Sequence, residues 1–192
     1  MKKILIGTHN KGKFKEISTL ISKKFHKISP IHLKIPSPKE TGKTFSSNSK
    51  LKVNFFSKYV NYPVISDDSG LCINSLNEKP GIYSARLAKR HGSFYKAMKH
   101  ILKKMKNEKN RSASFICSLS FKYPKKKPVN VTGKIKGKIS KRIIGKNGFG
   151  YDAIFIPKTK KITFGQMSKK EKIRTDHRFI AFKKMKKKIK TL

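Results

Sequence analysis

The sequence predicts a single α/β domain of mixed topology over residues 1–192, and three observations lead to that prediction. Short apolar runs typical of buried strands alternate with segments whose apolar residues are three or four positions apart, which is typical of helices. One later segment, 112–121, instead alternates apolar and polar residues as a half-buried strand does. No internal repeat or linker divides the chain, and its length suits one core of ordinary size.

The first third of the chain reads as strand, loop and helix, followed by a strand and a second helix. Residues 3–7 form a short apolar run, and apolar residues at helical spacing follow the loop behind it, namely Phe14, Ile17, Leu20 and Ile21. A second strand is expected across 27–35. Thr44 is a suitable N-cap for a helix over 45–60, which would bury three apolar side chains, Val53, Phe56 and Val60.

The remaining elements follow the same patterns. Two short strands, "PVISDD" and "LCINS", are expected around an acidic pair, and a helix is expected to bury a stripe of Tyr95, Met98, Leu102 and Met105. Residues 128–139 are expected to be antiparallel neighbours of 112–121, and 153–157 forms another strand. A capping box at Ser168 and Glu171 opens a last helix, whose predicted inner side carries Ile173, His177, Ile180, Ala181 and Met185.

The charge is extreme: 49 lysines and arginines against nine acids give a formal net charge of +40. Such a surface attracts polyanions non-specifically at low salt. Only six of the basic residues are arginine, and the lysines spread along nearly the whole chain. Residue-specific nucleic-acid contacts favour arginine. We therefore favour drift in codon composition over a dedicated nucleic-acid surface.

The sequence also indicates the cellular compartment. Cys72 and Cys117 lie in apolar strand-like runs without metal-type spacing, and we interpret them as reduced core residues, with a disulfide as the alternative. The N-terminus has too few apolar residues for a signal peptide, and no stretch approaches the roughly 20 apolar residues of a membrane span. We expect a cytoplasmic protein with no membrane partner.

The strongest chemical signal is the adjacent pair Asp67 and Asp68 between two apolar runs. Adjacent carboxylates beside apolar surface repel each other and lose hydration. A Mg²⁺ ion would offset that cost, because hard cations take carboxylate oxygens, and Glu40 in a nearby loop would add a ligand. The alternative is a surface turn in which one aspartate caps local amides and the other is solvated.

Two glycine-containing loops are weaker signals. The loop "THNKGK", residues 8–13, combines lysines, a glycine and backbone amides near a helix N-terminus, which suits a phosphate. An ordinary strand-to-helix turn explains it equally well. "NGFGYD", residues 147–152, presents Phe149 and Tyr151, which would either stack on a flat ligand or pack inward.

Polar residues near the C-terminus complete the set. Lys172, His177 and Arg178 offer donors to carbonyl oxygens or phosphates. His177 falls on the apolar stripe of the last helix, where a hydrogen-bonded core histidine is the simpler interpretation.

The order of these motifs is more specific than any of them alone. "THNKGK", "ETG", "DDSG", "PGIYSAR", "GFGYD", "EK" and "HR" follow one another from Ile4 to about Phe182. In this order the chain closely resembles the inosine/xanthosine triphosphate pyrophosphatase family. The resemblance implies an elongated two-lobed mixed sheet with flanking helices and a central cleft, and a homodimer. It also implies hydrolysis of ITP, dITP and XTP to the monophosphate and pyrophosphate.

The resemblance places roles residue by residue. It makes Asp68 the proton acceptor and, with Glu40 and supported by Asp67, the Mg²⁺ site. It places Glu16 at the end of the loop pattern. The positions matched to substrate contacts are Thr8, His9, Asn10, Lys11, Gly12, Lys13, Ser69, Phe149, Gly150, Tyr151, Asp152, Lys172, His177 and Arg178.

Three positions depart from the family pattern. His9 stands where glycine is usual, Ser47 where glutamate is usual, and Asp176 where serine is usual. We still expect an active enzyme. The alternatives are a pyrophosphatase for other modified nucleotides, and a basic RNA- or ribosome-associated binding protein without catalysis. Five of the nine acids lie in or beside the motifs, which disfavours a pure polyanion binder.

Overall fold

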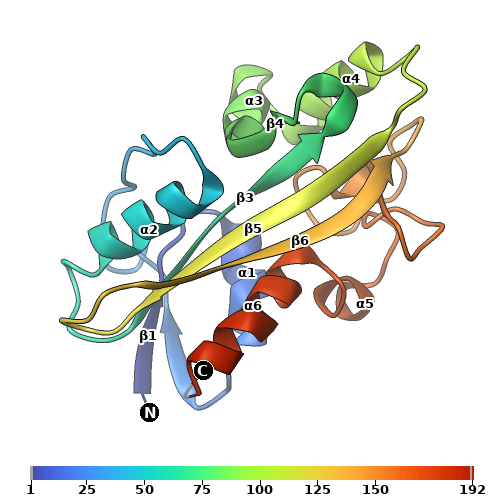
Figure 1. Cartoon of the computed structure of the whole chain (residues 1–192). Coiled ribbons are helices and arrows are strands. Elements are labelled where there is room, and N and C mark those ends of the chain that lie inside the picture. Colours follow the sequence, from blue (N-terminus) through green and yellow to red (C-terminus); the bar gives the residue numbers. More distant parts are fainter. Residues whose placement is uncertain (1, 191) are drawn as a thin grey trace. The chain divides into compact units, whose positions relative to one another are not determined.

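The computed structural model describes residues 2–190 and 192. Over these residues the strands form one mixed sheet in the order β2-β1-β3-β5-β6-β7, with β4 pairing β3 (Figure 1). The strands are β1 (Lys2–Ile6), β2 (Phe25–Ile28), β3 (Val64–Ile73), β4 (Lys79–Pro80), β5 (Ser112–Lys122), β6 (Val129–Ile139) and β7 (Phe155–Pro157). β1 is parallel to β2 and β3, whereas β3–β4 and β6–β7 are antiparallel. The predicted mixed sheet with flanking helices is confirmed.

The helices are α1 (Lys11–Leu20), α2 (Phe45–Phe56), α3 (Ser84–Arg90), α4 (Phe94–Lys104), α5 (Lys169–Ile173) and α6 (His177–Lys188). The chain divides into two compact units. The first unit comprises Met1–Asp68, Cys117–Gly133 and Arg178–Leu192, and the second comprises Ser69–Ile116 and Lys134–His177. Each unit has its own buried apolar clusters.

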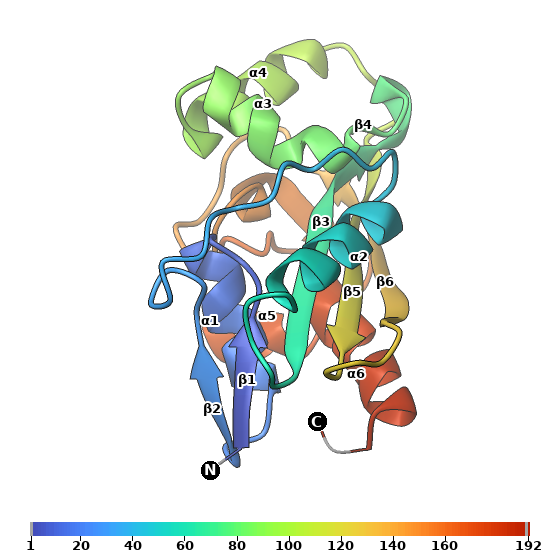
Figure 2. The same cartoon turned by 90° about the vertical axis from the view of Figure 1, so that its left-hand side faces the viewer.

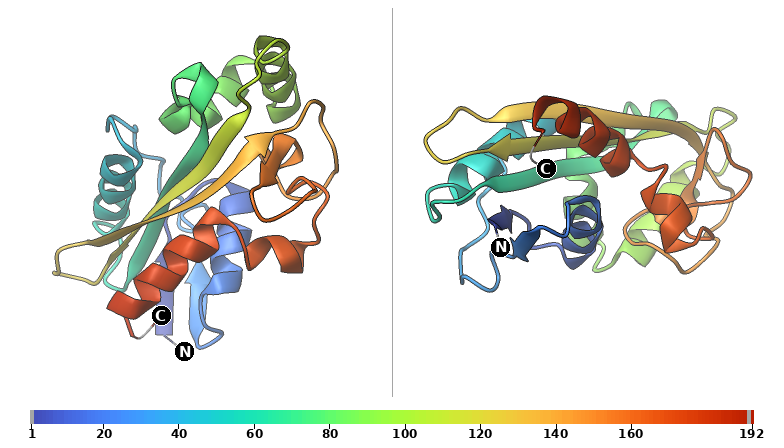
Figure 3. Two further views of the ribbon diagram at one scale, coloured as in Figure 1. Left: turned by 45° about the vertical axis from the view of Figure 1, so that its right-hand side comes forward. Right: turned by 90° about the horizontal axis from the view of Figure 1, so that it is seen from below.

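In the first unit, helices cover both faces of the strands. Ile17 of α1 and Phe182 of α6 share a cluster with strand residues that include Ile4 and Leu119. Val53 and Phe56 of α2 pack with Leu5 and Val64 in a separate cluster. Figures 2 and 3 show α2 on one side of these strands, and α1 and α6 on the other.

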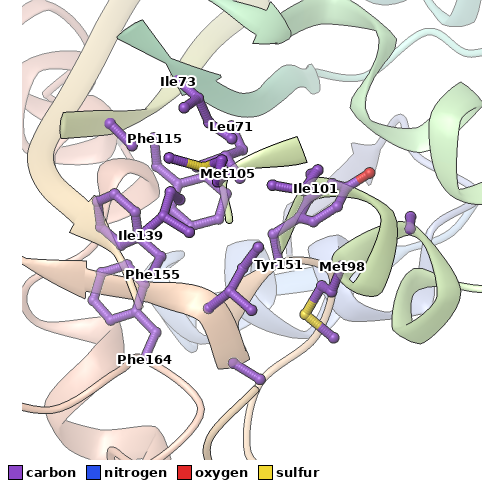
Figure 4. Close-up of a cluster of buried hydrophobic side chains, with 14 of the residues drawn as sticks. Leu71, Ile73, Met98, Ile101, Met105, Phe115, Ile139, Tyr151, Phe155 and Phe164 are labelled. Carbon is purple, nitrogen blue, oxygen red and sulfur yellow. The ribbon is translucent and has the colours of Figure 1, made fainter. Parts of the chain in front are cut away.

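In the second unit the core is rich in aromatic side chains (Figure 4). Phe115 of β5 packs edge-on against Phe155 at 4.7 Å between ring centroids, and Met98 and Ile101 come from α4. Edge-to-face aromatic pairs are stabilising beyond their buried area. The predicted stripe of α4 is correct except for Tyr95, which is 54% exposed.

Three predicted strands are corrected by the structure. The strand expected over 27–35 is β2, which ends at Ile28. Pro30 lacks an N–H for the ladder, its carbonyl accepts a hydrogen bond from the Ile35 amide in a turn, and Ile31 is exposed. The two short strands around the acidic pair are one continuous strand, β3, which is buried along nearly its whole length. A strand covered on both sides tolerates a continuous apolar run.

The helix expected over 45–60 begins as predicted, but it ends at Phe56. Thr44 caps it, and Ser47 completes a reciprocal capping box with Thr44. Ser47, which departs from the family pattern, therefore has a structural role here.

β5 is more buried than its alternating pattern predicts. Ser114, Ser118 and Ser120, expected to face solvent, are buried. Inside the first unit, Ser118 and Ser120 form a polar cage with Ser49 of α2 and Asn130 of β6. The Asn130 amide nitrogen lies 3.0, 3.0 and 2.8 Å from the hydroxyl oxygens of Ser49, Ser118 and Ser120. Hydrogen bonding within the cage offsets the cost of burying these groups.

Both cysteines are buried and neither forms a disulfide, so the prediction of reduced core residues is confirmed. Among the described residues, we find no helix with both the length and the apolar character that crossing a membrane requires.

Candidate active site

The site begins where β1 meets β3. The parallel pairing of Ile6 with Ile65 places the loop after β1 beside the middle of β3, and the Gly7 amide donates to the Ile65 carbonyl at 2.7 Å. A Cβ on Gly7 would lie 2.3 Å from the Ser66 hydroxyl oxygen. Glycine is therefore required for this close approach. The polar loop predicted to bind phosphate lies next to the acidic pair.

Asp67 is the buried anchor of the site, with no exposed surface. One carboxylate oxygen lies 3.2 Å from the Lys13 ammonium and 3.6 Å from Nε of Arg178. Burial pushes the pKa of Asp67 upward, but the positive charges of Lys13 and Arg178 outweigh it and hold that pKa well below its usual value. Asp67 is thus an ionised carboxylate that gathers two cations.

Asp68 has a different environment, although it is the next residue. It accepts a hydrogen bond from the Asn48 amide of α2 at 3.1 Å. Burial raises the pKa of Asp68, and the charges of Glu40 and Asp67 raise it further against the opposing effect of Lys52. Two neighbouring carboxyl groups whose pKa values move apart are suited to different roles.

Lys52 of α2 is a buried cation that the sequence patterns did not single out. Its ammonium lies 2.9 Å from the Glu40 carboxylate. Burial lowers the pKa of Lys52, but the charges of Asp67 and Asp68 outweigh it, so the net pKa is raised. Lys52 lies four residues after Asn48, so both side chains project from one side of α2. This four-residue spacing was the feature of the sequence that could have identified Lys52.

The loop from Thr8 to Lys13 is held by its own side chains. The Asn10 side-chain oxygen accepts from the Lys13 amide at 2.9 Å and caps α1, and Thr8 accepts from the Asn10 amide. His9, where the family pattern has glycine, turns its ring to the Ile35 carbonyl at 2.9 Å. Lys11 is exposed, and Gly12 is half-buried in the first turn of α1.

Arg178 and Glu16 form a buried ion pair within the first unit. Nη1 of Arg178 lies 2.8 Å from the Glu16 carboxylate, and the two side chains are 5% and 11% exposed. Because Glu16 is on α1 and Arg178 is on α6, the pair joins the two helices. The guanidinium therefore holds Glu16 and Asp67 together.

The second unit has its own charged group. Lys172 is buried, with its ammonium 3.1 Å from Asp152 and 3.5 Å from Asp176. Asp152 also accepts from the Phe149 amide at 2.8 Å. Gly148 has φ of +73°, and a Cβ there would lie 2.1 Å from the Asp152 carboxylate. The glycine-rich turn therefore serves to wrap the backbone around Asp152.

The aromatic residues of this group divide between two interpretations. The half-buried Phe149 ring lies 5.3 Å from the Lys172 ammonium. Tyr151 packs inward, with its hydroxyl donating to the Ser84 carbonyl at 2.9 Å. The His177 ring stacks on Phe115 at 4.8 Å and is almost fully buried. The side chains of Tyr151 and His177 therefore pack into the core, as the alternative interpretation of each residue predicted.

Ser69 follows the acidic pair on β3 and is half-buried. Among residues 2–190 and 192, no three or more histidine, cysteine, aspartate or glutamate side chains form a ready-made metal cage. The donor set still fits Mg²⁺, which keeps several waters and usually takes only one or two carboxylates plus phosphate oxygens. Asp68 and Glu40 are the carboxylates suited to it, because Asp67 is engaged with Lys13 and Arg178.

The mixed sheet and the buried acid–lysine–arginine cluster define an α/β protein whose polar site lies where β1 ends beside the parallel strand β3. The chain belongs to the Ham1 family, whose model matches residues 4–188. It is 39% identical over 197 residues to the dITP/XTP pyrophosphatase of Oceanobacillus iheyensis, covering 100% of both chains. It is 36% identical over 190 residues to that of Bacillus licheniformis, covering 96% of each.

Solved structures agree with this assignment. The Staphylococcus aureus Ham1 protein superposes with a TM-score of 0.87 at 34% identity, covering 98% of both chains. A HAM1 protein from Coxiella burnetii gives a TM-score of 0.88 at 29% identity, covering 100% of both.

Proposed function

We propose that this chain is one catalytic domain that hydrolyses non-standard purine nucleoside triphosphates, namely ITP, dITP and XTP, to the monophosphate and pyrophosphate. The observation that carries the proposal is the contrast between the two adjacent carboxyl groups. Asp67 is locked by Lys13 and Arg178, whereas Asp68 accepts from Asn48 and has a raised pKa. The names of the relatives support the same reaction.

The triphosphate is bound by the loop after β1. Lys13 supplies positive charge beside the carboxylates, and the capped start of α1 presents amides toward an anion. The loop residues assigned to the substrate are Thr8, His9, Asn10, Lys11, Gly12 and Lys13. Glu40 and Asp68 would hold Mg²⁺, with Asp67 in support. When bound, this ion neutralises phosphate charge and polarises phosphoryl oxygens.

Asp68 acts as the proton acceptor. It takes a proton from a water molecule as the water oxygen forms a bond to the α-phosphorus. The bond from the α-phosphorus to the bridging oxygen then breaks, and pyrophosphate leaves with that oxygen. A raised pKa suits this role, because a carboxylate whose pKa is nearer to the working pH is a stronger base and accepts a proton more readily. The raised pKa of Lys52 keeps it protonated to balance the carboxylates.

The nucleoside is recognised by Ser69, by Phe149, Gly150, Tyr151 and Asp152, and by Lys172, His177 and Arg178. Phe149 is the stacking ring, and Tyr151 acts through its backbone because its side chain is in the core. The 6-oxo group of hypoxanthine or xanthine accepts hydrogen bonds from His177 or Arg178. Adenine presents a donor at that position and would leave these groups unpaired, which is costly away from water.

The test is hydrolysis of dITP with Mg²⁺, following the monophosphate and pyrophosphate separately, with dATP and dGTP as competitors. Asp68→Asn should lower kcat by roughly 10²–10⁴-fold, the range for loss of a general base. Glu108→Gln, which removes an exposed acid outside the site, should leave kcat unchanged. Release of inorganic phosphate, or no turnover of any nucleotide, would refute the proposal and favour the basic RNA-binding alternative.

We also propose a cytoplasmic homodimer. Light scattering after size exclusion should give twice the mass of the chain. A single-chain mass at micromolar concentration would contradict the dimer and leave the reaction itself untouched.

A further inference from the structure

The second unit contains a hollow of about 740 Å³ beside α3, formed entirely by residues between Ser75 and Lys104. None of these residues belongs to the candidate active site. Its volume lies within the range of small-molecule sites, which are mostly apolar with a few well-placed polar groups. "PGIYSAR", residues 80–86, contributes three of its lining residues, although none of the proposed catalytic roles uses them.

The hollow combines apolar surface with one prominent aromatic ring. Its apolar lining comes from Leu76, Pro80, Leu87 and Ile101. Tyr83 lines the hollow with 55% of its surface exposed, so its ring is open to a ligand. Its neighbour Ser84 is anchored, because the Leu71 amide donates to its hydroxyl and the Tyr151 hydroxyl donates to its carbonyl. Tyr83 is therefore presented from a rigid segment, as binding sites require.

The hollow is also lined by four cationic side chains, beside the polar residues Ser75, Asn77 and His100. Arg86 and Arg90 lie one turn apart on α3 and both line it, with Lys79 and Lys104. The Arg86 guanidinium stacks on the Tyr83 ring at 4.4 Å. No lining residue is an acid.

Arginine is scarce in this chain, which makes the pairing of Arg86 and Arg90 informative. Only six of the 49 basic residues are arginine. Arg178 pairs with carboxylates, Arg111 donates to the backbone carbonyls of Met105, Ile139 and Ser140, and Arg86 donates to the Ile82 carbonyl at 3.4 Å. The guanidinium fork binds phosphate oxygens in pairs, which lysine does not do. Two arginines beside an exposed aromatic ring match a ligand with a flat ring and a phosphate.

We propose that this hollow is a second ligand site that binds a nucleoside monophosphate, with its base against Tyr83 and its phosphate between Arg86 and Arg90. The site does not depend on the proposed reaction. A second copy of the chain is a poorer occupant, because an isologous contact would bring the same cations together. The surrounding lysines offer a general attraction to phosphate, and the arginine pair provides the specific contact.

Because the chain has no tryptophan, a single tryptophan can report on the hollow. Tyr83→Trp places one in it, and Tyr95→Trp is the matched control. Tyr95 is 54% exposed, has a lysine over its ring at 4.8 Å and does not line the hollow. At 150 mM salt, added AMP should shift the emission of the Tyr83→Trp protein saturably and leave the Tyr95→Trp protein unchanged. Adenosine or inorganic phosphate alone should bind at least tenfold more weakly.

Charge variants in the Tyr83→Trp background separate recognition from general attraction. Arg86→Ala/Arg90→Ala should raise the Kd for AMP at least tenfold. Arg142→Ala/Arg174→Ala, which removes the same charge from two exposed positions elsewhere, should raise it less than threefold. If the alanine pair does not fold, Arg86→Lys/Arg90→Lys preserves the charge and should still weaken binding severalfold, because the fork is lost.

Four results would overturn the proposal. The first is the absence of a saturable shift in emission up to about 10 mM AMP, because a site that weak would not be an ordinary metabolite site. The second is an equal response from the Tyr95→Trp protein, and the third is an equal loss of AMP affinity in the two double arginine variants. The fourth is a shift in emission that depends on protein concentration without any ligand. The last result would place a second copy in the hollow.

Discussion

Replacing Arg178 with methionine removes a cation that contacts two buried carboxylates. The guanidinium lies 2.8 Å from Glu16 and 3.6 Å from Asp67, whose side chains are 11% and 0% exposed. Removing one partner of a buried ion pair costs about 3–5 kcal/mol. Asp67 keeps Lys13 at 3.2 Å, and Glu16 retains some contact with water, so the lower end of that range applies. We expect Arg178→Met to lose about 3 kcal/mol of unfolding free energy.

Urea denaturation at pH 7 measures this loss. With a slope of about 2.5 kcal/mol per molar urea, the midpoint should fall by about 1.2 M. Arg174→Met, at an exposed position nearby in the sequence, should change stability by less than about 0.5 kcal/mol. Adding Glu16→Gln to Arg178→Met should cost less than the sum of the single changes, because the buried charge left without its cation is then neutral. A loss below about 1 kcal/mol for Arg178→Met would refute the inference that this pair braces α1 and α6.

Three further predictions follow from other contacts. The folded pKa of Asp67 lies below its ordinary value of 3.8, so its stabilising contribution is present above about pH 4 and is lost as the pH falls below it; acid unfolding should be shallower between pH 4 and 2 in Asp67→Asn. Gly7→Ala should destabilise the protein by about 1–3 kcal/mol in the same urea assay, because the new Cβ meets Ser66. Both cysteines are buried, and burial raises the pKa of Cys72 to about 12, so a thiol reagent at pH 8 should label neither cysteine in the native protein and both after unfolding; labelling of the native protein would contradict this.

The elements that the sequence predicted best were those with strong local signals. The N-cap at Thr44, the capping box of Ser168 and Glu171 and the apolar run of β1 act over a few residues and were predicted correctly. The single last helix predicted from Ser168 is instead two helices, α5 and α6. The end of β2 was misjudged because the apolar residues after Pro30 looked like a strand, although they bury no common face. Burial of the serines of β5 could not be read from alternation, because α2 covers that face and the partner residues lie far along the chain.

The same distinction applies to the candidate site. The acidic pair was conspicuous because acids are rare in this chain, and adjacency to apolar runs indicated burial. Lys52 was not predicted as a site residue for the opposite reason. Lysines are so common in this chain that nothing in the local sequence distinguishes a buried lysine from an exposed one. The partnership of Glu16 with Arg178 joins residues 162 positions apart, so only the fold reveals it.

The polar cage around Asn130 bears on how α2 is aimed. Apolar contacts such as those of Val53 and Phe56 tolerate sliding and rolling, whereas hydrogen bonds among Ser49, Asn130 and the β5 serines are satisfied at one rotation of the helix only. Asn48 and Lys52 flank Ser49 on α2, so the rotation that satisfies the cage also directs them toward Asp68 and Glu40. The orientation of the charged groups that α2 contributes is thus set by hydrogen bonds among uncharged hydroxyl and amide groups. A substitution that weakens these hydrogen bonds would displace Asn48 and Lys52 from their partners without changing the charge of any residue.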